Sequence, residues 1–238
     1  MTQDQPPSEA SRTELPPEEP LPWTVQDTWI GIGLLFFVVI VNWIAQRYGW
    51  ASSIFYQTFG IVVLEFSLLI PILLIFAWRK VSWATLGFRK FKGRAMRLGC
   101  SLLLAAYVII IVYNSILLIF HVSTQGVNLI HRFDALKSPI GFIVAAVLVA
   151  PFVEEMSFRG FVFQGFRQRY GWNGAAILSA IIFAIFHLQI VALVPIFVIG
   201  YVLAQVYHRS NSIWPGIMLH SLINSLTVLS LALTGHVH

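Results

Sequence analysis

Residues 144–166 read VAAVLVAPFVEEMSFRGFVFQGF, an apolar run that carries two adjacent glutamates and an arginine. A charged side chain near the centre of a bilayer costs about 2.5–3.5 kcal/mol on insertion scales, so each of the three needs a partner or a wet cavity. Glu155 and Arg159 are four residues apart and share one face of a helix, which predicts an ion pair within the segment. Glu154 points about 100° away from Glu155 around the helix axis. It has no partner in its own helix, so we expect its partner on a neighbouring helix.

The composition of the chain places this run in a membrane. Of the 238 residues, 58% are hydrophobic and 11% are charged, whereas a soluble domain carries about 25% charged residues. Much of the surface must therefore face lipid. The formal net charge is +5, but seven of the fifteen Lys and Arg lie between Arg79 and Arg97, as in a membrane protein of fixed orientation. We expect membrane lipids as partners and no nucleic acid.

Apolar runs of about 20 residues cross the hydrocarbon layer as helices, because the backbone must satisfy its own hydrogen bonds there. The expected fold class is all-α, a polytopic α-helical membrane protein with about seven transmembrane helices (six to eight) forming a bundle. The predicted spans run near Thr28 to Ile44, Ile54 to Trp78, Met96 to Phe120, Pro139 to Phe158, Asn173 to His187, Ile190 to Tyr207 and Ile213 to Leu233.

The distribution of basic residues predicts the orientation. If the cluster from Arg79 to Arg97 is cytoplasmic and the spans alternate, eleven Lys and Arg fall on the cytoplasmic side and three, Arg47, Arg132 and Lys137, fall opposite. The N-terminus is then cytoplasmic and the C-terminus lies on the opposite side. The expected location is a membrane crossed several times, the cell membrane if the host is bacterial.

Three parts are expected along the chain. Residues 1–22 are acidic and Pro-rich and predict a disordered tail. Residues 23–133 hold the N-terminal transmembrane helices and the basic cytoplasmic loop, and residues 134–238 form a second membrane domain. Cys100 is the single cysteine, so neither an intrachain disulfide nor a cysteine-based metal site is expected.

Further polar side chains lie in the apolar spans. His187 ends the fifth predicted span, and His220 and Asn224, four residues apart, share one face of the seventh. Polar groups on separate helices are least costly where they meet in one wet, interior site. Glu65 in the second span has no spaced partner, and we expect a structural role for it.

Such a site supports two kinds of hydrolysis. Glu154 can act as general base on a water that a histidine orients, or Glu154, His187 and His220 can bind Zn²⁺ and lower the pKa of its bound water. Ser157 has no GxSxG around it, so a serine nucleophile is not expected. Two alternatives without hydrolysis stay open: a purely structural ion pair with interior histidines, and a proton-coupled transporter that uses Glu65 and Glu154.

Together these residues resemble the motifs of a known family, the CPBP (CAAX protease and bacteriocin-processing) intramembrane proteases. EEMSFR (Glu154 to Arg159) is similar to the motif EExxxR, FAIFH (Phe183 to His187) to FxxxH, and HSLIN (His220 to Asn224) to HxxxN. The family includes type II CAAX prenyl endopeptidases and bacteriocin-immunity proteins. The resemblance covers roughly Asp134 to Leu233.

The resemblance implies an intramembrane endopeptidase, a hydrolase that cleaves a peptide bond of a membrane-associated substrate, prenylated or not, in the domain of residues 134–238. It implies these roles: Glu154 as general base, His187 as the residue that orients the water, His220 and Asn224 as donors to the oxyanion, and Glu155 with Arg159 as the supporting pair.

The family is described both as metalloproteases and as glutamate-type proteases. We favour no required cofactor, with Zn as the alternative, because the two histidines lie on separate helices and not at i and i+4 of one helix. A non-enzymatic immunity or scaffold protein of the same fold is the alternative function. The implied partner is a membrane-anchored peptide or protein substrate, and the oligomeric state is not indicated.

Overall fold

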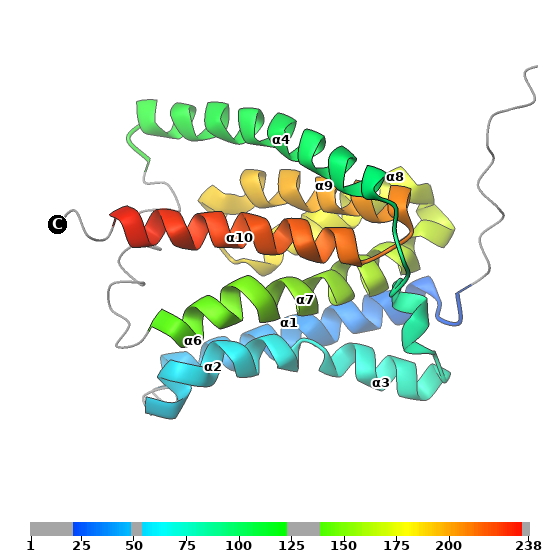
Figure 1. Ribbon diagram of the computed structural model, residues 1–238. Coiled ribbons are helices and arrows are strands. Elements are labelled where there is room, and N and C mark those ends of the chain that lie inside the picture. The colour runs from blue at the N-terminus through cyan, green and yellow to red at the C-terminus, as the bar shows by residue number, and fades with distance from the viewer. Residues whose placement is uncertain (1–20, 49–53, 123–138, 235–238) are drawn as a thin grey trace, which may run out of the picture.

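The computed structural model of the chain describes residues 21–48, 54–122 and 139–234. Throughout these residues the regular structure is helical and no strand occurs, so the predicted all-α fold is confirmed. The long helices lie side by side as a bundle (Figure 1).

In chain order the elements are α1 (Val25–Arg47), α2 (Ile54–Ser67), α3 (Ile70–Arg79), the 3-10 turn η2 (Trp83–Leu86), α4 (Gly93–Ile119), α6 (Pro139–Val144), the π-helical η3 (Ala145–Val149), α7 (Ala150–Glu155), the π-helical η4 (Met156–Phe163), α8 (Gln164–Phe186), the 3-10 turn η5 (Ile190–Ala192), α9 (Leu193–Ser210) and α10 (Trp214–Thr234).

Parts of the sequence-based organisation fall outside the described residues. They include the expected tail up to residue 20, the boundary expected between residues 133 and 134, and both Arg132 and Lys137.

Six helical runs in the described part of the chain are long and apolar enough to cross a membrane. They are Val25–Ala45, Val62–Arg79, Gly93–Ile119, Ile140–Phe186, Ile190–Ser210 and Trp214–Leu233. The chain is therefore a multi-pass membrane protein, and its spans correspond to those expected from hydropathy.

The run Ile140–Phe186 contains two of the predicted spans. Its 47 residues would extend about 70 Å as one straight helix, more than twice the hydrocarbon thickness. Instead the helix breaks at Gly171, which has a left-handed φ of 67°. The two arms then pack against each other, since the Ser179 hydroxyl donates to the Phe158 carbonyl at 3.0 Å and the rings of Phe158 and Phe183 lie 4.9 Å apart. Counting these two arms separately agrees with the expectation of about seven helices.

The interior of the bundle draws on both halves of the chain. Trp23, only 1% exposed, stacks on Phe161 with ring centroids 5.6 Å apart and also contacts Phe76. In contrast, Phe37 on α1 and Leu104 on α4 are exposed, as side chains that face lipid should be. The N-terminal helices are thus packed onto the helices that carry the motifs.

The start of α1 is tied to the end of α3. Thr24 caps α1 by accepting from the Asp27 backbone N–H, and the Asp27 carboxylate accepts from the Thr24 N–H in return. Asp27 also forms an ion pair with Arg79 at 2.9 Å. The first helix therefore begins on the side of the membrane where the basic cluster begins.

The segment after α3 is held in place by hydrogen bonds from α9 and from the residue just before α10. The Tyr207 hydroxyl donates to the Leu86 carbonyl at 3.2 Å, and the Ile213 N–H donates to the Gly87 carbonyl at 2.9 Å. Gly87 has a φ of +95°, and a Cβ added there would lie 2.7 Å from the Tyr207 hydroxyl oxygen. Only glycine meets both conditions without strain.

We predict that Gly87→Ala lowers the free energy of unfolding by about 1–3 kcal/mol, through left-handed strain and the clash with Tyr207. The midpoint of thermal unfolding in detergent micelles measures the change. Gly33→Ala in α1 is the matched control, because a Cβ there meets nothing within 4 Å, and it should be neutral or slightly stabilising. Equal unfolding midpoints for the two variants would show that the close contact between Gly87 and Tyr207 does not stabilise the protein.

Candidate active site

The two motif glutamates lie where the helix is irregular. Pro151 has no N–H to donate, and just before it the Ala150 N–H donates to the Ala145 carbonyl, five residues back, in η3. The second π-helical stretch, η4, starts directly after Glu155. Such π-helical turns within α-helices occur frequently at functional sites.

The ion pair expected from the spacing is present. Arg159 Nη1 lies 2.8 Å from Glu155 Oε1, and both side chains are 0% exposed. Arg159 Nη2 donates to the Gly200 carbonyl of α9 at 3.0 Å, and the guanidinium carbon lies 4.5 Å from the centroid of the Phe183 ring. The pair therefore also connects its own helix to α8 and α9.

His220 lies between the two glutamates. Its Nδ1 is 3.2 Å from Glu155 Oε1, within hydrogen-bond distance, and its Nε2 is 3.6 Å from Glu154 Oε2. The side chain is buried. Arg159, Glu155, His220 and Glu154 thus form one connected chain of ionisable groups across two helices. The contact between Glu155 and His220 was not predictable from the sequence, because residue spacing reveals partners only within a helix.

His187 is held by its own helix. Its Nδ1 lies 2.9 Å from the Phe183 carbonyl, which can accept only if Nδ1 carries the proton, so Nε2 then has a free lone pair. The Phe183 ring packs edge-on against the His187 ring, with centroids 4.8 Å apart. The same ring also contacts His220 at 5.9 Å. Phe183 therefore packs against both histidines.

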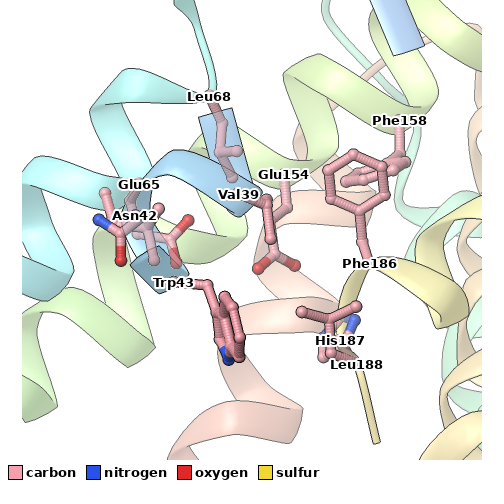
Figure 2. A pocket seen from close by; sticks show the side chains of 11 residues that line it. Val39, Asn42, Trp43, Glu65, Leu68, Glu154, Phe158, Phe186, His187 and Leu188 are labelled. Carbon is pink, nitrogen blue, oxygen red and sulfur yellow. The ribbon is translucent and has the colours of Figure 1, made fainter. Parts of the chain in front are cut away.

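Glu154 and His187 face a common cavity of about 250 Å³. Figure 2 shows the Glu154 carboxyl group in this space, with Trp43 and His187 on either side of it. His220 and Asn224 are not among the residues that line it. The lining residues are Val39, Asn42, Trp43, Leu64, Glu65, Leu68, Glu154, Phe158, Phe186, His187 and Leu188.

Six of the eleven residues that line this cavity lie in the first two spans, which carry none of the motifs. Asn42 and Trp43 belong to α1, and Glu65 belongs to α2. Glu65 had been expected to be structural, on the ground that it had no partner at helical spacing. Its place opposite Glu154 depends on the packing of α2 against the motif helices, which the sequence pattern did not indicate.

Asn224 lies apart from the cavity. Its side-chain amide donates to the Ala146 carbonyl at 2.7 Å. Ala146 belongs to η3, where the wider turn leaves carbonyl groups without their usual i+4 partners. Asn224 therefore holds the π-helical turn ahead of the glutamates, in addition to any role toward a substrate.

The three side chains considered as zinc ligands are only partly brought together. Across residues 21–48, 54–122 and 139–234, no group of three or more His, Cys, Asp or Glu is placed to hold an ion. His220 Nε2 lies 3.6 Å from Glu154 Oε2, whereas His187 faces Glu154 from the cavity, which His220 does not line.

Carboxyl and imidazole side chains from different helices meet inside this membrane bundle. Comparison with known proteins relates the chain to membrane peptidases. Residues 136–226, which include all three motifs, match the family model described as type II CAAX prenyl endopeptidase Rce1-like. The resemblance drawn from the three motifs is thereby confirmed for this region.

A relative in Bacillus subtilis (strain 168), named "Putative membrane peptidase YdiL", is 25% identical over 111 residues. The matched region covers 47% of this chain and 46% of the relative, so the chain spans about half the length of the curated relative that it matches. No solved structure matches the chain.

We predict that Arg159→Met lowers the free energy of unfolding by about 3–5 kcal/mol, because it leaves the Glu155 carboxylate buried without its cation. The double variant Glu155→Gln with Arg159→Met removes both charges and should recover much of this loss. Unfolding in mixed detergent micelles, analysed as a double-mutant cycle, measures the coupling. Additive losses would show that the two side chains do not stabilise each other.

Proposed function

We propose that the protein is an intramembrane endopeptidase that hydrolyses a peptide bond with a water activated by Glu154. The observation that carries the proposal is the cavity shared by Glu154 and His187, two residues of the region that matches the Rce1-like family. A carboxylate and a neutral imidazole facing one small space can bind a water between them.

The proposed reaction needs no covalent intermediate. Glu154 takes one proton from the water, and His187 orients that water by accepting its other O–H at Nε2. The hydroxide oxygen attacks the carbonyl carbon of the substrate, and the carbonyl becomes a tetrahedral oxyanion. When the C–N bond breaks, Glu154 gives its proton to the leaving nitrogen, so the carboxylate is restored.

The oxyanion needs N–H donors close to the reacting carbonyl. We assign this role to His220 and Asn224, as the family resemblance implies. The Nε2 of His220 already lies on the side of Glu154. Because the Glu155 carboxylate accepts from Nδ1–H, donation from Nε2 to the oxyanion as well requires the doubly protonated ring. Asn224 uses one of its N–H groups on Ala146, and we assign its second N–H to the oxyanion.

The proposed substrate is a membrane-anchored peptide or protein, because the cavity lies among spanning helices and its wall is mostly apolar. The family name supports a prenylated C-terminus as the first substrate to try. We place the basic residues near η4, Arg167 and Arg169, on the cytoplasmic side, from which such a substrate would approach.

We expect Glu154→Gln and His187→Ala to insert and fold normally but to hydrolyse peptide about 10²–10⁴-fold more slowly, because each removes one of the groups that activate water. Cleavage of a fluorogenic farnesylated peptide in proteoliposomes measures this. Ser157→Ala is the matched control: the Ser157 hydroxyl is buried and donates to the Val153 carbonyl at 2.9 Å, so activity should persist. Peptide binding that survives in all variants, with no cleavage by the wild type, would instead indicate an immunity or scaffold protein.

We also propose that catalysis needs no metal, and this can be tested separately. Dialysis against a strong chelator should leave the rate unchanged, and metal analysis of that sample should find far less than one equivalent of zinc. Loss of activity that returns on adding Zn²⁺ would refute this part of the proposal while leaving the peptidase itself intact.

The proposed orientation has the N-terminus in the cytoplasm and the C-terminus opposite. Reporter fusions that are active on only one side of the membrane should give opposite results at the two ends. Equal results would mean that the number of crossings is even and that the chain does not alternate as proposed.

A further inference from the structure

Glu65 faces the cavity, yet the proposed reaction does not use it. It lies within the span Val62–Arg79. Its Oε2 is fully enclosed and has no hydrogen-bond partner among the described residues. Figure 2 shows its carboxyl group on the cavity side, across from that of Glu154. A carboxyl group inside a membrane span is costly unless a partner or a wet cavity serves it, so such a residue indicates function.

The cavity is rich in carboxyl groups. Two of them line it, His187 is its one imidazole, and no lysine or arginine lines it in the described part of the chain. The two carboxyl groups face the same small space, and two carboxylates repel each other strongly where water is scarce. The buried cation Arg159 is already engaged by Glu155 and by the Gly200 carbonyl. A cation brought by a ligand would offset this repulsion.

The rest of the wall suits a basic side chain. The rim residue Trp43 is 59% exposed, and Phe158 and Phe186 also line the space. Aromatic faces attract ammonium and guanidinium groups, and the alkyl part of a lysine or arginine packs well against apolar walls. A volume of about 250 Å³ is below the roughly 300–1,000 Å³ of sites for drug-sized ligands, so it fits one long side chain.

We infer that Glu65 selects substrates with a lysine or arginine close to the bond that is cut. This inference rests on the peptidase function proposed above. The basic side chain enters the cavity, lays its alkyl part along the aromatic walls and pairs its charged end with the Glu65 carboxylate. Because Glu154 faces the same cavity, a residue held there lies within a short distance of the activated water.

The test uses the full-length protein in nanodiscs and pairs of internally quenched, farnesylated peptides. In each pair one position around the cleaved bond is lysine or its neutral analogue norleucine. We expect the wild type to prefer lysine at one position. Glu65→Gln, which keeps the shape and hydrogen-bonding capacity, should reduce this preference in kcat/KM by about tenfold or more. Cleavage of the norleucine peptide should change much less than cleavage of the lysine peptide. Glu65→Lys should favour a glutamate peptide instead.

Ser67→Ala in the same helix is the matched control. The Ser67 hydroxyl donates to the Leu64 carbonyl of its own helix, so its loss should leave the ratio of lysine to norleucine cleavage at the wild-type value. The inference is overturned if Glu65→Gln keeps the wild-type ratio. It is also overturned if the wild type shows no preference for lysine at any position.

A binding measurement separates this inference from the peptidase proposal. If the wild type cleaves none of the peptides, the proposed peptidase function fails, and fluorescence anisotropy of the labelled peptides decides the inference alone. Tighter binding of the lysine peptide, lost in Glu65→Gln, would support cation selection at Glu65. Equal binding of both peptides to the wild type would overturn it.

Discussion

The buried ion pair between Glu155 and Arg159 is the interaction on which the rest of the site depends. It lies inside a membrane protein with both side chains fully enclosed, where an unpaired charge would be very costly. Each partner also makes a contact outside the pair. Arg159 donates to the Gly200 carbonyl of α9, and Glu155 holds Nδ1 of His220 on α10. One ion pair therefore orients three helices around Glu154.

The helices without motifs complete the site. The first two spans supply Asn42, Trp43 and Glu65 to the cavity, and Trp23 packs against Phe161 behind it. A membrane bundle gains little hydrophobic energy from bringing apolar helices together, so close packing and polar contacts must define its arrangement. The ion pair between Asp27 and Arg79 and the hydrogen bond from the Ile213 N–H to the Gly87 carbonyl are such polar contacts.

The sequence predicted what is local and missed what depends on packing between helices. Hydropathy located the spans, and spacing located the pair of Glu155 and Arg159, because both signals act within one segment. The place of Glu65 in the cavity was not predictable in this way. Spanning helices are apolar toward lipid and toward their neighbours alike, so periodicity does not show which face points inward. The bond from Asn224 to Ala146 likewise arises only when α10 meets a π-helical turn.

The reversal at Gly171 bears on how the protein enters the bilayer during synthesis. The two arms of this helical hairpin are joined almost without a loop, which favours their insertion together as one unit. Both members of the ion pair lie on its first arm, one turn apart. Glu155 and Arg159 can therefore neutralise each other before α9 and α10 have been made. These two charges then enter lipid already paired, and the later helices assemble around them.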